Sequence, residues 1–312
     1  QADPLPSWNR SASKTAIIEF VEKVTDENSD AFVPAAHRIA VFDNDGTLWC
    51  ENPVPPQAAF AGAELKRMLP ENPQWKELPA VQDFMKADIA ALKANHNRGI
   101  LKLLGITHAD RTPEDFNASV SDWLETSKHP QLDRPYNETV YQPMLELLTY
   151  LRDNAFETWI VSGGGQDFMR VFAEGTYGII PQHVIGSYGA VKYETKNGKP
   201  TFMKSIETVF VDDKNGKPEA IHRFIGRRPI AAFGNSDGDQ AMIEYTTLEN
   251  PRPSLGVIIH HTDANREYAY DAKPKSSGKL VTALEAAPAN GWVVVDIATV
   301  SYTHLTLPTI QL

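Results

Sequence analysis

The chain has 312 residues, of which 42% are hydrophobic and 22% charged, the proportions of an ordinary globular protein. Its net charge of −10 argues against a surface that binds nucleic acid without sequence preference, because the phosphate backbone would be repelled. The single cysteine, Cys50, excludes an internal disulfide framework and a cysteine-rich metal site. No apolar run approaches the ~18 residues of a membrane-spanning helix, so we expect no membrane span.

Both ends of the sequence differ in character from the rest. The chain begins QADPLPSWN, which resembles a mature start after removal of a signal peptide. We therefore expect a periplasmic or secreted protein, with a cytoplasmic location left open. Residues 299–312 include VSYTHLTLPT, which has neither helical nor strand periodicity and resembles a reading frame through a transposon-based sequencing adapter. We predict that residues 299–312 are a non-native tail and exclude them from functional reasoning.

A helix and a buried strand are expected before residue 50. Ile17, Phe20, Val21 and Val24 recur at helical spacing, which predicts an amphipathic helix packed on a core. Residues 39–42, IAVF, form a continuous apolar run, which is typical of a parallel strand covered on both faces.

The sequence from residue 51 to residue 136 is punctuated by proline and has helical patterning throughout. We predict that 51–136 is a helical cap inserted into the core. One of its helices is expected to carry an apolar face of Val81, Phe84, Met85, Ile89 and Leu92. Another begins at TPED, with Thr112 as N-cap and Pro113 as the first helical residue.

Strand and helix patterns alternate again from Tyr141, which is typical of βαβ units. The expected strands are ETWIV at 157–161, PIAAF at 229–233, LGVII at 255–259 and VVVDI at 293–297. Helices are expected near 218–225, from about Gln240 and near 277–286. The turn signal KNGK at 196–199 predicts a small hairpin beside the sheet. We therefore predict an α/β fold, a Rossmann-like parallel sheet sandwiched by helices, with residues 1–50 and 137–298 as its core.

Two aspartates, Asp43 and Asp45, follow the strand at 39–42, and Gly46 ends the apolar run. Residues i and i+2 of a strand point the same way, so both carboxylates can flank one reacting group. Ligands of open α/β sheets bind at the carboxyl edge of the strands. The pair therefore predicts a phosphoryl-transfer site at this edge.

Three further polar signatures follow DNDGT at 43–47 along the chain. They are VSGGG at 161–165, GKP at 216–218 and GNSDGD at 234–239. In this order the four motifs resemble the haloacid dehalogenase-like hydrolase superfamily, most closely its phosphatase branch with a helical cap, as in phosphoserine phosphatases. The resemblance covers about residues 14–298.

The resemblance implies a role for each motif. Asp43 is the expected nucleophile that forms an aspartyl-phosphate, and Asp45 the expected general acid and base. Members that cleave carbon–halogen bonds lack the second acid, so dehalogenation is disfavoured. Ser162 is expected to act with the glycines after it, whose backbone amides can approach a phosphate closely. The residues expected to bind the substrate phosphate are Thr47, Gly163 and Gly164.

One lysine is expected to stabilise charge on the transferring phosphoryl group. Lys217 matches the family's third motif by its place in GKP, 18 residues before Asn235. Lys204 and Lys214 are the alternatives, although both could be solvated surface charges.

The resemblance also implies Mg²⁺, which prefers oxygen ligands. The predicted ligands are the Asp43 side chain, the Asp45 backbone carbonyl, Asn235 and Asp239. This chain departs from the common pattern, because Asn235 stands where the family usually has an acid, so one negative charge is lost. Asp237 is interpreted either as a residue near the metal or as the N-cap of the next helix.

Three arginines, Arg98, Arg111 and Arg134, are candidate anion contacts, with solvated helix charges as the other interpretation. His260 and His261 follow a strand, and at most one is expected to face the active edge. The leading hypothesis is a Mg²⁺-dependent phosphomonoester hydrolase acting on a small phosphorylated metabolite. The alternatives are a phosphotransferase or mutase with the same intermediate, and a catalytically weak phosphate-binding module.

Overall fold

A seven-stranded sheet forms the centre of the molecule, in the strand order β4-β3-β2-β1-β5-β6-β7. The computed structural model describes residues 2–301 and 305, apart from the side chains of residues 95–97. Neighbouring strands run parallel except β3 and β4, which form an antiparallel hairpin. The strands are β1 (Ile39–Phe42), β2 (Glu157–Gly165), β3 (Val184–Lys196), β4 (Lys199–Phe210), β5 (Ala231–Gly234), β6 (Leu255–His260) and β7 (Val293–Asp296). The predicted α/β class is confirmed.

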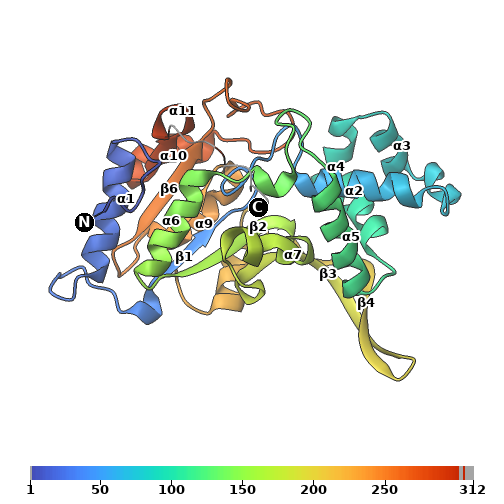
Figure 1. The fold of residues 1–312 in the computed structure, drawn as a ribbon, viewed down its shortest axis with the longest axis horizontal. Helices are drawn as coiled ribbons and strands as arrows, with labels where there is room; N and C mark the ends of the chain where they lie inside the picture. The colour runs from blue at the N-terminus through green and yellow to red at the C-terminus, as the bar shows by residue number, and fades with distance from the viewer. Residues whose placement is uncertain (1, 302–304, 306–312) are drawn as a thin grey trace, which may run out of the picture.

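Helices cover both faces of this sheet (Figure 1). One face packs against α1 (Ala12–Thr25), α6 (Gln142–Asp153) and α7 (Gln166–Tyr177). The other packs against α8 (Gly216–Ala220), α9 (Gln240–Thr247) and α10 (Thr282–Asn290). A π-helical turn (Ile221–Ile225) continues α8, and α11 (Ile297–Val300) follows β7. None of the helices in the described part of the chain is long and apolar enough to cross a membrane.

The alternation of side chains along β1 explains why the strand is apolar throughout. Ala40 and Phe42 belong to the apolar cluster on the α1 side, whereas Ile39 and Val41 belong to the cluster on the α9 side. All four residues are buried, as expected for a strand covered on both faces. The central position of β1 places the residues that follow it in the middle of the sheet's carboxyl edge.

Four α-helices between β1 and α6, which together form the helical layer, lie beside the sheet, on the right in Figure 1. They are α2 (Pro56–Met68), α3 (Pro79–Met85), α4 (Ile89–His108) and α5 (Pro113–Thr126). An apolar cluster of their own holds α2, α3 and α4 together, and it consists of Leu65, Ala80, Val81, Leu92, Leu103 and Ile106. The segment has the helical structure expected for it, and the boundaries of cap and core stay a prediction.

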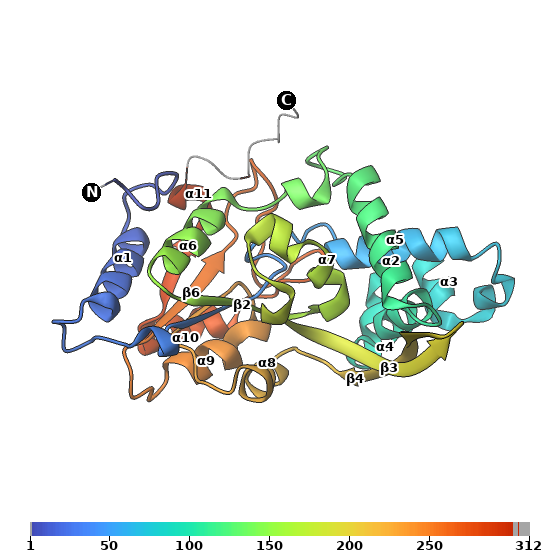
Figure 2. The same cartoon turned by 60° about the horizontal axis from the view of Figure 1, so that its bottom comes forward.

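The β3–β4 hairpin runs beneath α4 (Figure 2). Two main-chain hydrogen bonds join β4 to the segment that follows α4. The N–H of Asp110 donates to the Lys204 carbonyl and the Lys204 N–H donates to the Arg111 carbonyl, both at 2.9 Å. The helical layer is therefore attached to the edge of the sheet as well as through its own chain ends.

The single helix expected across Val81 to Leu92 is in fact two helices, α3 and α4. Ala87 adopts a φ of 54°, in the left-handed region that a continuous α-helix does not use. The Asp88 side chain then caps α4 by accepting a backbone N–H at 2.9 Å. As a result Met85, expected on the buried face, is 61% exposed.

The helix expected near 277–286 begins later, at Thr282. Gly278 has a φ of 84°, which keeps the preceding segment out of the helix. The Asp237 carboxylate accepts hydrogen bonds from the N–H groups of Val281 at 2.8 Å and Ala283 at 3.1 Å. Asp237 therefore caps α10 and not the helix that follows it in sequence.

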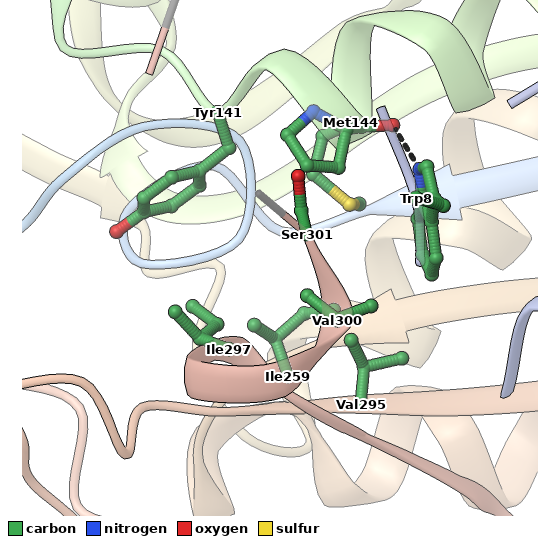
Figure 3. A pocket seen from close by; sticks show the side chains of 9 residues that line it. Trp8, Tyr141, Met144, Ile259, Val295, Ile297, Val300 and Ser301 are labelled. Carbon is green, nitrogen blue, oxygen red and sulfur yellow. Dashed lines mark hydrogen bonds between the residues drawn. The ribbon is translucent and has the colours of Figure 1, made fainter. Parts of the chain in front are cut away.

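A cavity of about 20 Å³ lies between α6, α11 and the ends of β6 and β7 (Figure 3). Its walls include Trp8, Tyr141, Met144, Ile259, Val295, Ile297, Val300 and Ser301. The space suits about one water molecule, so it is a packing gap and no substrate site. Ser301 belongs to the predicted non-native tail, of which residues 302–304 and 306–312 lie outside the described residues.

The stacked rings of Phe42 and Phe233 give a direct test of the core. Their centroids lie 4.4 Å apart and neither side chain is exposed. We expect Phe233→Ala to lower the free energy of unfolding by about 3–5 kcal/mol in urea denaturation, because the truncation leaves a cavity beside β1. Val209→Ala, at a hairpin side chain that is 54% exposed, is the control and should change it by less than about 0.5 kcal/mol. Equal effects of the two substitutions would contradict the packing.

Candidate active site

The register of the sheet brings three of the four motifs to one edge. Phe42 is opposite Ile160 of β2 and Phe233 of β5. Asp43 therefore leaves β1 beside the residues that follow those positions, and its N–H donates to the Phe233 carbonyl at 2.9 Å. The DNDGT, VSGGG and GNSDGD motifs therefore meet at the carboxyl edge of the sheet.

Lys217 brings the fourth motif to the same point. Its ammonium group donates to Asp43 Oδ1 at 2.9 Å, to Asp239 Oδ1 at 2.6 Å and to the Val161 carbonyl at 2.9 Å. The side chain is only 2% exposed. Burial by itself would lower the pKa of Lys217, but the carboxylates of Asp239 and Asp43 raise it above the ordinary lysine value. The lysine is therefore a fixed positive charge.

The two alternative lysines lie elsewhere. Lys204 pairs with Asp167, and its ammonium group sits 4.7 Å from the centre of the Phe116 ring. Lys214 is exposed. Of the three candidates, Lys217 is the one in contact with Asp43.

The two aspartates of the first motif differ in their surroundings. Burial and the Asp239 carboxylate raise the pKa of Asp43 well above its usual range, while Lys217 opposes that shift. Asp45 is half-buried, and the Trp49 indole N–H donates to its Oδ1 at 2.7 Å. Burial also raises the pKa of Asp45. One carboxylate thus faces a buried cation, and the other is held by a neutral donor.

Asp239, predicted as a magnesium ligand, is already engaged at both oxygens. Oδ1 accepts from Lys217. Oδ2 accepts from the Asn235 N–H at 2.9 Å, and from the N–H and hydroxyl of Ser236 at 3.0 and 3.2 Å. The Asp239 carboxylate therefore holds the loop of residues 235–239 together and orients the ammonium group of Lys217. The role of Asp239 as a magnesium ligand stays a prediction.

Asn235 is fixed by partners at both ends of its amide. Its Nδ2 donates to Glu51 Oε1 at 2.7 Å, and its Oδ1 accepts from the Thr47 hydroxyl at 3.2 Å. Gly46 has a φ of 79°, and a Cβ at this position would clash with both Glu51 Oε1 and Asn235 Nδ2. The amide oxygen consequently faces the loop that carries Asp43 and Thr47.

The glycines after Ser162 form the end of β2, and some of their amides are used within the protein. Ser162 is buried, and its hydroxyl accepts from the Gly164 N–H at 3.2 Å. The Gly165 N–H donates at 2.6 Å to Gln57 Oε1, which comes from α2 of the helical layer. β2 extends to Gly165, beyond the expected end at residue 161. The helical layer thus touches this edge directly.

Residues 40–244 match the family described as haloacid dehalogenase-like hydrolase. The chain belongs to this family. The resemblance read from the four motifs is confirmed, and the protein is a hydrolase of this family. No curated protein sequence matches the chain.

Solved structures support the fold of this hydrolase. A protein of unknown function from Anaerococcus prevotii DSM 20548 is similar over 85% of this chain and 90% of its own, with 15% identity and a TM-score of 0.55. Another of unknown function, from Bordetella pertussis Tohama I, is similar over 83% of this chain and 98% of its own, with 14% identity and a TM-score of 0.52.

Three residues at this edge of the hydrolase were not predicted from sequence: Glu51, Gln57 and Glu267. Glu51 and Glu267 are buried acids, which is costly unless they have partners, so the placement of Glu51 in the motif segment DNDGTLWCE was the available signal. Gln57 carries no such signal.

His261 is the histidine that faces the active edge. Its Nδ1 lies 2.9 Å from Glu267 Oε1 and its Nε2 lies 2.7 Å from the Gly46 carbonyl. Burial lowers the pKa of His261, but the hydrogen bond and charge of Glu267 outweigh burial and raise it. The Gly46 carbonyl can only accept, so Nε2 donates to it and the histidine holds the Gly46 peptide. His260 points away, 3.5 Å from Asp271.

The three candidate arginines do not converge on Asp43. Arg111 pairs with Glu64 at 2.8 Å, and Arg134 donates to the Glu138 carbonyl at 3.3 Å. Arg98 is exposed on α4. The interpretation as a solvated helix charge fits Arg98, whereas Arg111 and Arg134 lie outside the helices and make structural contacts.

The buried lysine gives a prediction about stability. We expect Lys217→Met to lower the free energy of unfolding by about 3–5 kcal/mol, because Asp43 and Asp239 would be left buried without their cation. Urea denaturation at neutral pH measures the loss. Lys214→Met, at an exposed side chain, is the control, with a change under about 0.5 kcal/mol. A Lys217 variant as stable as its control would show that the contact carries no net stabilisation.

Proposed function

We propose that this hydrolase is a Mg²⁺-dependent phosphatase that acts on a small phosphorylated metabolite through an aspartyl-phosphate on Asp43. The observation that carries the proposal is the buried contact of 2.9 Å between Lys217 Nζ and Asp43 Oδ1. A nucleophilic carboxylate beside a fixed ammonium group suits a reaction in which negative charge on phosphoryl oxygens must be stabilised.

The proposed first step transfers the phosphoryl group to the protein. A carboxylate oxygen of Asp43 attacks phosphorus, and the bond between phosphorus and the ester oxygen breaks. Asp45 gives its proton to the leaving alkoxide. The raised pKa of Asp45 favours the protonated form that this step requires, and the Trp49 N–H holds the carboxyl group in place.

The second step releases phosphate. Water attacks phosphorus, Asp45 accepts the proton of that water, and the bond between phosphorus and the Asp43 oxygen breaks. The Lys217 ammonium group stabilises charge in both steps. Thr47, Ser162, Gly163 and Gly164 are the proposed contacts of the phosphoryl oxygens, because their hydroxyl and N–H groups belong to the loop after β1 and the end of β2, the strand beside β1.

The oxygen atoms at this edge of the sheet suit a hard cation such as Mg²⁺. The proposed ligands are the Asp43 carboxylate, the Asp45 backbone carbonyl and Asn235 Oδ1, all of them oxygen atoms. The orientation of the Asn235 amide is the observation that supports the fit, because Nδ2 is committed to Glu51 and the oxygen is left on the site's side. When bound, the ion would neutralise charge on the phosphoryl oxygens and favour the ionised form of Asp43. Asp239 positions Lys217 in this proposal.

The nucleophile is tested by Asp43→Asn. We expect wild-type protein with Mg²⁺ to release inorganic phosphate from at least one member of a broad panel of phosphomonoesters, and the variant to lose the activity to background, because an amide cannot take over the phosphoryl group. Lys204→Met, which alters a lysine outside the site, is the control for expression and folding. Full activity of the asparagine variant would contradict the proposal, as would calorimetric phosphate binding by a wild-type protein that turns over nothing.

The metal is tested by its removal. We expect dialysis against EDTA to abolish phosphate release and added Mg²⁺ to restore it, because the cation supplies several kcal/mol of charge stabilisation in phosphoryl transfer. Urea denaturation before and after dialysis serves as the control, since the fold should persist. Undiminished activity in excess chelator would remove Mg²⁺ from the mechanism. The same assay with added acceptor alcohols separates hydrolysis from phosphotransfer, since only a phosphotransferase forms new esters.

A further inference from the structure

We infer that Glu51 is a positioning residue of the magnesium site: it orients the Asn235 amide and supplies the negative charge that this asparagine lacks. The inference rests on the proposed function, because it concerns how the proposed metal is held. Its starting point is the departure of this chain from an acid at position 235, together with a buried carboxylate in contact with the substituting side chain.

An asparagine can present either its oxygen or its NH₂ group to a neighbour, and only the oxygen can bind a cation. Glu51 decides between the two orientations. Its Oε1 lies 2.7 Å from Asn235 Nδ2, and the reversed amide would place its oxygen against a carboxylate oxygen. The hydroxyl of Thr47 donates to Asn235 Oδ1 at 3.2 Å and favours the same orientation.

The rest of the surroundings hold Glu51 in place. Tyr270 donates its hydroxyl proton to Oε1 at 2.8 Å, and Ser277 donates to Oε2 at 2.7 Å. Three hydrogen-bond donors therefore face the carboxylate, from Asn235, Tyr270 and Ser277. A Cβ on Gly278 would clash with Oε1, so the backbone itself closes the back of the site.

The position of this charge gives it an electrostatic role. Glu51 is 4% exposed, so water does little to screen it from the side on which the cation would bind. The hydrogen bond through Nδ2 also polarises the Asn235 amide and increases the negative charge on its oxygen. Outer carboxylates that act on a ligand in this way typically change metal affinity by about 10–100-fold.

Two variants separate the charge of Glu51 from its packing. Glu51→Gln keeps the volume and an acceptor oxygen for Asn235 Nδ2 but removes the charge. The double variant Glu51→Gln with Asn235→Asp moves the carboxylate to position 235 and leaves an amide behind it. Glu64→Gln is the matched control, because Glu64 is another buried glutamate but its partners are Arg67 and Arg111 of the helical layer.

Magnesium binding to each purified protein is measured by isothermal titration calorimetry without substrate. We expect Glu51→Gln to weaken the affinity at least tenfold, the double variant to bind at least as tightly as wild type, and Glu64→Gln to stay within twofold. The Mg²⁺ concentration for half-maximal phosphate release should shift in the same order. Rescue by the double variant is an outcome that a merely structural role would not produce.

The inference fails, with the proposed function intact, if wild type binds Mg²⁺ and Glu51→Gln binds within twofold of it. It also fails if the double variant binds tenfold more weakly than wild type. Should Glu51→Gln not fold, as judged by thermal unfolding without metal, the double variant alone decides, because it retains one carboxylate and one amide in contact. If wild type binds no Mg²⁺, the metal of the proposed function and this inference fall together.

Discussion

The ammonium group of Lys217 is the contact on which the arrangement of the site depends. It joins the loop after β1, the middle of β2 and the turn after β5 through hydrogen bonds of 2.6–2.9 Å. Asp212 adds a further buried carboxyl group, and burial raises its pKa to about 7 although Lys217 acts in the opposite direction. A single buried cation therefore offsets several acidic groups. If the loops that carry these groups moved apart, the ammonium and carboxylate groups would lose their partners.

The fold was predictable from sequence because its signals are local. The apolar runs of β1, β5 and β6 and the turn at residues 196–199 specify strands and a hairpin without knowledge of distant residues. The position of Asp43 followed from the end of one such run. The break at Ala87 was not predictable in this way, because apolar spacing continues across it and only the backbone conformation reveals two helices.

The same distinction between local signals and distant contacts applies to the candidate site. Lys217 could be selected because it lies in a short motif ahead of a helix. The partner of Asn235 could not, because Glu51 is 184 residues away in sequence and meets it only after the sheet has formed. Spacing also failed to separate the tasks of Asn235 and Asp239, which lie on one turn. Only the hydrogen bonds around each oxygen show that Asp239 contacts the ammonium group of Lys217.

The main-chain bonds between β4 and the segment at Asp110 and Arg111 change how the helical layer can move. The two chain connections between the helical layer and the sheet would, by themselves, leave the far side of the layer free to rotate. The hairpin holds that side, in addition to the hydrogen bond between Gln57 and Gly165 and the packing of Phe60 and Trp123 against Phe168. If the helical layer moves away from the sheet, the hairpin must move with it or the two hydrogen bonds at Lys204 must break.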